Sequence, residues 1–282
     1  MRRILHLSVL CLVAGAASAC STPDQIVNTP DIPTAGVRFI NAVPDTNALD
    51  MRFVDIIESN AQYGISFRNS PITSGGVTAS STVEYKNTQA GSRHFRVFLS
   101  STVQAVASTV IKDTTVTITA GKLYTAIMWG TARTGGMKFA FIEENIPDPG
   151  TNVGLRVMNA TTAAIDARQY PSAGTAPVAA TWASVAPLTF TTFVNASPAQ
   201  VKFNITAAGS ATAMFTDGLA LIGAAPAVDL EGLPGTTVAG SAVTAIVFPA
   251  SVVGSNAPQG GVYTTPQLTF MWDKRPPRLS TN

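Results

Sequence analysis

The feature that most limits what this chain can fold into is an internal repeat. Residues 37–53 (VRFINAVPDTNALDMRF) align with residues 155–170 (LRVMNATTAAIDARQY) at an offset of about 118 residues. Residues 120–130 (AGKLYTAIMWG) align with residues 239–249 (AGSAVTAIVFP) at almost the same offset. Two separate matches at one offset predict a tandem duplication of a unit of roughly 115 residues. The joint is predicted in the turn-rich segment IPDPGTN, residues 146–152.

Each unit has the pattern of short β-strands. Apolar and polar residues alternate with a period of two in residues 37–40, 95–99 and 115–119. Gly, Pro, Asn and Asp separate such runs, and the chain is rich in Thr, which favours extended backbone. About seven short strands in a unit of this size are typical of a sandwich. The sequence therefore predicts an all-β fold of two tandem immunoglobulin-like antiparallel β-sandwich domains, with a small closed barrel as the alternative.

The N-terminus has the pattern of an export signal. Met1-Arg2-Arg3 is positively charged, residues 4–14 are mostly apolar, and Ala17-Ser18-Ala19 supplies small residues for cleavage. The apolar run is too short to span a bilayer. We therefore divide the chain into a signal peptide (1–19), a lipidated N-terminus and tether (20–35), a first β-sandwich repeat (36–146), a second repeat (153–273) and a polar tail (274–282).

Cys20 determines whether the mature chain is attached to a membrane. A small residue followed by Cys directly after an apolar run resembles the bacterial lipobox, in which the Cys is acylated, although Ala17 stands where Leu is usual. We expect lipidation at Cys20 and a place in the bacterial cell envelope, anchored to the outer membrane. Ordinary cleavage after Ala19 would instead give a secreted soluble protein. Cys11 is lost with the leader in either case, so the mature fold has no internal disulfide.

Several of these segments together resemble a known family. They are VRFINAVPDTNALDMRFVD, the Tyr63-Gly64 step, AGSRHFRVF, AGKLYTAIMWG and NIPDPG. The set is similar to the bacterial domain-of-unknown-function family 4397, which commonly occurs in tandem in exported lipoproteins. The resemblance covers about residues 36–273. It implies a secreted or envelope-anchored β-sandwich protein, and it brings no catalytic motif with it.

The charge balance argues against a nucleic-acid partner. The chain has 18 Lys and Arg residues against 16 Asp and Glu residues. Loss of Arg2 and Arg3 with the leader leaves equal numbers of each. Binding to phosphates needs a net basic face, which a neutral chain does not supply.

Few residues are candidates for chemistry. His94 is the one histidine beyond the leader, and it lies in a predicted strand, where we expect it to face solvent. Asp45, Asp50 and Asp55 are the closest approach to a carboxylate cluster, but they lack the spacing of a calcium loop. We interpret the Asn41–Asp45 segment instead as a turn whose Asn and Asp side chains bind nearby backbone amides.

Aromatic residues offer a second kind of candidate. Trp129 and Trp182 lie on predicted strands and could bind a sugar if exposed together; otherwise they fill the cores. Glu143 and Glu144 are adjacent on a strand and therefore point to opposite faces, which makes them a poor acid and nucleophile pair. The candidates for ligand binding are thus Trp129, Trp182, Asp45 and Asp50, and we predict no catalytic or metal-binding residue.

These features favour a non-enzymatic cell-envelope lipoprotein that acts in surface binding, adhesion or scaffolding, without a cofactor. Its partners would be the membrane, through the lipid anchor, and a protein or glycan ligand. An envelope carbohydrate-binding module is the main alternative. Two others stay open: a hydrolase that uses Asp50 or Asp166, and self-assembly through exposed sheet edges.

Overall fold

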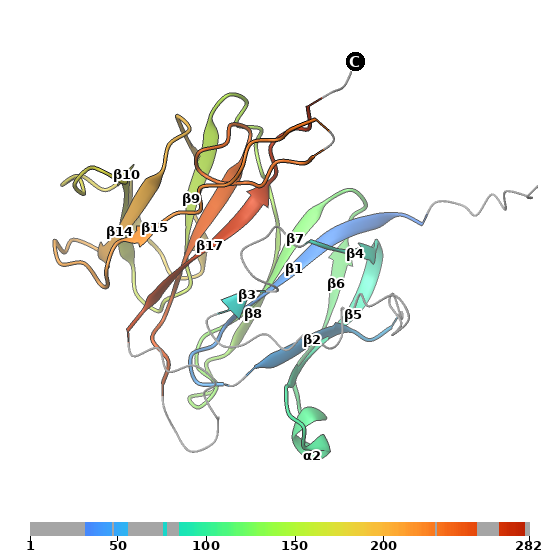
Figure 1. Cartoon of the computed structure of the whole chain (residues 1–282). Coiled ribbons are helices and arrows are strands. Elements are labelled where there is room, and N and C mark those ends of the chain that lie inside the picture. Colours follow the sequence, from blue (N-terminus) through green and yellow to red (C-terminus); the bar gives the residue numbers. More distant parts are fainter. Residues whose placement is uncertain are drawn as a thin grey trace, which may run out of the picture. The chain divides into compact units, whose positions relative to one another are not determined.

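The computed structural model describes residues 32–46, 48–55, 76–77, 85–228, 230–252 and 265–279 (Figure 1). Contacts divide the chain into two units, Met1–Ile32 and Pro33–Asn282. The predicted signal peptide and Cys20 lie outside the described residues, and so does Tyr63. Within the described part of the chain, no helix is both long enough and apolar enough to cross a membrane.

The first half of the unit Pro33–Asn282 contains two sheets. Sheet A has the strand order β3-β1-β7-β8, with β4 also paired to β1, and sheet B has the order β2-β5-β6. The strands of sheet A are β1 (Thr34–Ala42), β3 (Gly76–Val77), β4 (Lys86–Gln89), β7 (Leu123–Trp129) and β8 (Lys138–Glu143). Those of sheet B are β2 (Leu49–Phe53), β5 (Gly91–Leu99) and β6 (Val110–Ile118). A single helical turn, α2 (Gln104–Ala107), lies between β5 and β6.

The second half repeats this plan. Sheet C has the order β12-β9-β16-β17, with β13 also paired to β9, and sheet D has the order β11-β10-β14-β15. The strands of sheet C are β9 (Val153–Asn159), β12 (Thr189–Phe190), β13 (Val194–Ala196), β16 (Ala242–Phe248) and β17 (Gln267–Lys274). Those of sheet D are β10 (Ile165–Pro171), β11 (Trp182–Val185), β14 (Val201–Ala207) and β15 (Gly218–Leu219).

The prediction of an all-β fold is confirmed. The pairing is more varied than a purely antiparallel plan, because β1 pairs with β7 in parallel and β9 pairs with β16 in parallel. Parallel strands are usually covered on both faces. Accordingly, every residue of β9 and β16 is buried, as are all but the first residue of β1.

The period-two alternation of these strands explains how they fill two cores at once. In β1, Val37 and Phe39 pack into a core shared by sheets A and B, together with Phe95 from β5. In β9, Leu155 and Val157 pack into the corresponding core of sheets C and D. Each half thus has the face-to-face sheet packing of a β-sandwich.

The opposite faces of the same strands meet in a third core. It joins residues of sheet A with residues of sheet C. Its buried members are Ile40, Ala42, Ile127, Met158, Ala160, Ile246, Phe248 and Met271. Because this core draws on both halves, residues Pro33–Asn282 form one compact unit.

Candidate functional site

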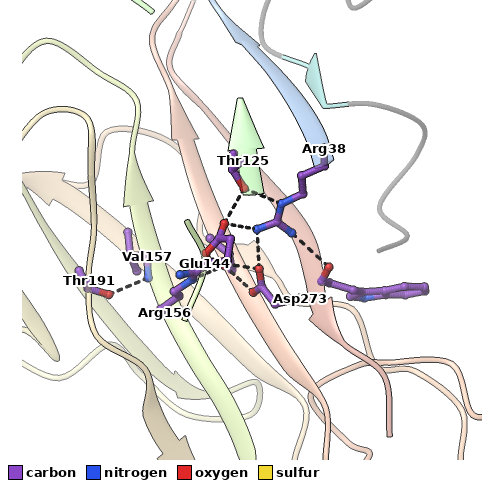
Figure 2. Close-up of polar contacts among 9 residues, drawn as sticks. Arg38, Thr125, Glu144, Arg156, Val157, Thr191 and Asp273 are labelled. Atoms are coloured by element: carbon purple, nitrogen blue, oxygen red, sulfur yellow. Dashed lines mark hydrogen bonds and ion pairs between the residues drawn. The ribbon is translucent and has the colours of Figure 1, made fainter. Parts of the chain in front are cut away.

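Four charged side chains meet beside this third core (Figure 2). Arg38 comes from β1, Arg156 from β9 and Asp273 from β17, while Glu144 directly follows β8. Their side chains are 0–5% exposed. Arg38, Arg156 and Asp273 each lie on the face of their strand that points toward the other half. We call this group the charge cluster.

On the side of the first half, Arg38 is tied to both acids. Its Nη2 donates to Glu144 at 2.7 Å and to Asp273 at 2.8 Å. Its Nε donates to the Thr125 hydroxyl at 2.9 Å, and that hydroxyl donates to Glu144 at 2.5 Å. One acid of each half therefore binds the same guanidinium.

The second half makes the same contacts. Nη2 of Arg156 donates to Glu144 at 2.8 Å and to Asp273 at 3.0 Å. Its Nε donates to the Thr244 hydroxyl at 2.7 Å, and that hydroxyl donates to Asp273 at 2.5 Å. Arg156 and Thr244 thus repeat the roles of Arg38 and Thr125. The cluster carries two positive and two negative charges, so its formal charge is zero.

Burial and ion pairing act against each other in this cluster. Burial alone would raise the pKa of Glu144, but the guanidinium groups of Arg38 and Arg156 hold it below the ordinary value. Burial likewise favours loss of the Arg38 proton, yet the carboxylates, Asp273 foremost, raise the pKa of Arg38. Glu144 and Arg38 are therefore both held in their charged forms. Removal of one would leave an uncompensated charge in a buried place.

Aromatic rings cover both guanidinium groups. The ring centroid of Tyr85 lies 4.6 Å from Cζ of Arg38. The centroids of Phe190 and Phe193 each lie 4.4 Å from Cζ of Arg156. Tyr85 and Phe193 hold equivalent positions, since each directly precedes a strand, β4 or β13, that pairs with β1 or β9. These are cation–π contacts in a desolvated setting.

A cavity of about 420 Å³ opens beside the second half of the cluster. It lies between the segment that follows β8 and the segment from β12 to β13. Its lining residues include Glu143, Glu144, Asn145, Arg156, Phe190, Thr191, Thr192 and Phe193. The Thr191 hydroxyl also accepts a hydrogen bond from the backbone amide of Val157 at 3.0 Å (Figure 2).

The aspartates singled out from the sequence lie apart from the charge cluster and bind other groups. Asp45 is buried and accepts the backbone amides of Ala132 and Arg133 at 2.7 and 2.8 Å, which braces the loop between β7 and β8. Asp50 pairs with Arg52 on the same strand. Among the described residues there is no group of three His, Cys, Asp or Glu side chains that could hold a metal ion.

Asp55 and Asp166 are also bound within the fold. Asp55 accepts Nε and Nη2 of Arg93 at 3.0 and 3.1 Å. Asp166 accepts the backbone amides of Ser184 and Gly209 at 2.7 and 2.9 Å. These two amides hold the pKa of Asp166 below its ordinary range, which favours a permanently charged turn-binding carboxylate.

The two tryptophans are in different surroundings. Trp182 is 7% exposed and stacks on Phe203 in the core of sheets C and D. Trp129 is half-buried at the edge of the third core, and its indole N–H donates to the carbonyl of Ala160 at 3.0 Å. The two rings therefore do not form a shared exposed platform. The remaining candidate, His94, is partly exposed and pairs with Asp113.

Sequence reasoning missed the charge cluster. Asp273, the last residue of the predicted second repeat, lies in β17 and is buried, and no sequence feature singled it out. Of the tail's three basic residues, Lys274 pairs with Asp148, and Arg275 and Arg278 pair with Glu231. One signal was available: the repeat aligns Arg38 with Arg156 inside otherwise apolar strands. A charge kept in both copies of such a strand indicates a buried partner.

The fold and the cluster together define an all-β protein with β-sandwich-like packing and a buried, charge-balanced joint. Residues 35–168 match the model of the family described as Domain of unknown function (DUF4397). The match confirms the family resemblance, and it includes Arg38, Glu144 and Arg156. It ends in β10, so tandem copies stay a prediction. A search of the curated proteins found no match.

Proposed function

We propose that this chain is a non-enzymatic lipoprotein of the bacterial cell envelope, in which two immunoglobulin-like sandwich modules act in surface binding, adhesion or scaffolding. The observation that carries the non-enzymatic part is the charge cluster. Its acids and bases are paired with one another and with Thr125 and Thr244. A catalytic acid or base must instead be available to substrate. The cluster serves to join the two halves.

The envelope location is supported by the sequence pattern around Cys20. An acylated Cys20, followed by a proline-containing tether, would hold the unit Pro33–Asn282 at a membrane surface. One acyl chain gives weak anchoring and several give stable anchoring, so the extent of acylation determines whether the protein stays in the envelope.

Labelling of cells with radioactive palmitate tests this proposal. The native chain is expected to incorporate label and to fractionate with the outer membrane. The Cys20→Ala variant is expected to lose the label and to appear in the soluble fraction. Cys11→Ala is the matched control, since Cys11 belongs to the predicted leader and its replacement should leave labelling unchanged. Equal labelling of the native chain and Cys20→Ala would contradict the anchor.

A second candidate function is supported by the cavity beside Arg156. An envelope carbohydrate-binding module needs a recess with both aromatic and hydrogen-bonding side chains. The aromatic residues in such a recess would be Phe190 and Phe193, rather than Trp129 and Trp182.

A further inference from the structure

The two arginines of the charge cluster differ in one hydrogen bond. Nη1 of Arg38 donates to the carbonyl of Trp272 at 3.5 Å (Figure 2). Within the described part of the chain, Nη1 of Arg156 has no acceptor, although the Arg156 side chain is only 5% exposed. Arg156 is also a lining residue of the 420 Å³ cavity. This nitrogen is not one of the fully enclosed unpartnered atoms of the described residues, so it reaches solvent and can donate to water or to a ligand oxygen in the cavity.

From this we infer that the cavity is a binding site for a neutral sugar unit of a glycan, with Arg156 Nη1 as the donor to a sugar oxygen. The inference deepens the proposed surface-binding function and rests on it, because it names the ligand class.

The charges around the cavity favour a neutral ligand. The positive charge of Arg156 is already balanced by Glu144 and Asp273. A second carboxylate, Glu143, also lines the cavity. A ligand carboxylate or phosphate would lie beside these acids and would gain no unpaired positive charge. A ligand ammonium or guanidinium group has no acceptor to offer Nη1 of Arg156.

The remaining side chains of the cavity suit a polyhydroxyl ring. Asn145 provides an amide donor and acceptor, and Thr191 and Thr192 provide hydroxyl groups, which match the mixed donor and acceptor character of sugar hydroxyls. Phe190 and Phe193 supply apolar surface for the C–H faces of the ring. The cavity volume lies within the range of about 300–1,000 Å³ that is usual for small-ligand sites.

The test is a glycan array probed with the purified full chain, with neutral and carboxylated oligosaccharides side by side, followed by calorimetric titration with the neutral glycan that binds best. Thr192→Trp places a large ring at the cavity wall and is expected to abolish binding. Asn145→Ala, at an exposed position, is expected to weaken binding about tenfold, equivalent to one hydrogen bond. Thr212→Trp, at another exposed threonine, is the matched control and should bind as the native chain does.

Each outcome decides the inference. Binding of a neutral glycan that Thr192→Trp loses and Thr212→Trp keeps, with unchanged melting temperatures, supports it. It is overturned if no neutral glycan binds, if carboxylated glycans bind in preference, or if Asn145→Ala and Thr192→Trp both bind as the native chain does. A chain that is labelled by palmitate but binds no glycan contradicts the sugar site alone. A chain that binds glycan without a label contradicts the anchor alone.

Discussion

The Arg38 and Arg156 ends of the charge cluster bind the two acids and a threonine in the same way, yet their surroundings differ. Each arginine binds one threonine hydroxyl and both acids. The Arg38 end is closed by Tyr85 and by the carbonyl of Trp272. The Arg156 end borders a cavity. The four charged residues are constrained because each one pairs with a charged residue of the other half. The residues that cover the two arginines have no such constraint and can differ between the halves.

This difference suggests a division of roles between the two ends. Burial of four charges carries a large desolvation cost, which the cross-half ion pairs offset only when all four are present. At the Arg38 end, protein groups alone balance the buried charge. The open end leaves one guanidinium nitrogen for a ligand. Substitutions at the two ends should therefore differ in their effect on stability and on binding.

The largest expected effect comes from loss of an arginine. Arg38→Ala leaves two buried acids facing one base and should lower the free energy of unfolding by about 3–5 kcal/mol, as is usual for a broken buried pair. Arg156→Ala should cost less, about 1–3 kcal/mol, because water from the cavity can reach the acids. Urea denaturation of both variants measures the difference. A larger loss in Arg156→Ala would contradict the distinction between a closed and an open end.

A double variant sharpens the same comparison. Arg38→Ala combined with Asp273→Ala removes one charge of each sign and leaves Glu144 paired with Arg156. The combined loss of stability should be smaller than the sum of the two single losses, because the remaining charges balance. Strictly additive losses would show that the cluster does not act as a unit.

Glu144 should make stability depend on acid pH. The pKa of Glu144 lies below its ordinary value in the folded chain, because the two arginines outweigh burial. A carboxyl group whose pKa is lower in the folded chain than in the unfolded chain stabilises the folded chain at pH values above its unfolded-state pKa. This contribution is lost as the pH falls through the folded-state pKa. Glu144→Gln should therefore cost about 1–3 kcal/mol at pH 7. The difference between this variant and the native chain should narrow below pH 4.5.

Glu143→Gln is the matched control for this effect. Glu143 is next in sequence but is 49% exposed and pairs with Lys122 at the surface, whereas Glu144 is 2% exposed. Exposed pairs of this kind contribute roughly 0–1 kcal/mol. Unfolding midpoints measured from pH 3 to pH 7 would separate the two. A Glu144→Gln curve parallel to the native curve would show that Glu144 does not carry the acid dependence.

Local alternation predicted much of the fold. The runs at residues 37–40 and 95–99 lie in β1 and β5. The opposite faces predicted for Glu143 and Glu144 are observed as one exposed and one buried side chain. The predicted turn is observed in part: Asn41 accepts the amide of Val43, as Asn159 does that of Thr161, whereas Asp45 binds amides of the distant loop between β7 and β8. These features depend on neighbours along the chain, which the sequence shows directly.

The charge cluster depends on contacts that the sequence does not show. Alternation assigns residues to two faces of a strand, but it cannot say that both faces of β1 and β9 are covered. Arg38 and Asp273 are separated by most of the chain, and their contact exists only because the third core brings the two halves together. β17 also continues one residue into the predicted polar tail, since it ends at Lys274.

The smallest expected effect concerns Tyr85, the residue that most clearly distinguishes the closed end. Its hydroxyl is buried without a hydrogen-bond partner in the described part of the chain, and burial raises the pKa of that hydroxyl. The equivalent position in the second half is Phe193, which has no hydroxyl to satisfy.

Tyr85→Phe should therefore keep the ring over Arg38 and change stability by less than about 1 kcal/mol, in the stabilising direction. Thermal denaturation of Tyr85→Phe beside Tyr85→Leu, which also loses the cation–π contact and should be less stable, measures this effect. A clear loss of stability in Tyr85→Phe would mean that the hydroxyl helps to hold the Arg38 end, and the two ends would then differ in a second polar contact besides the bond from Arg38 Nη1 to the carbonyl of Trp272.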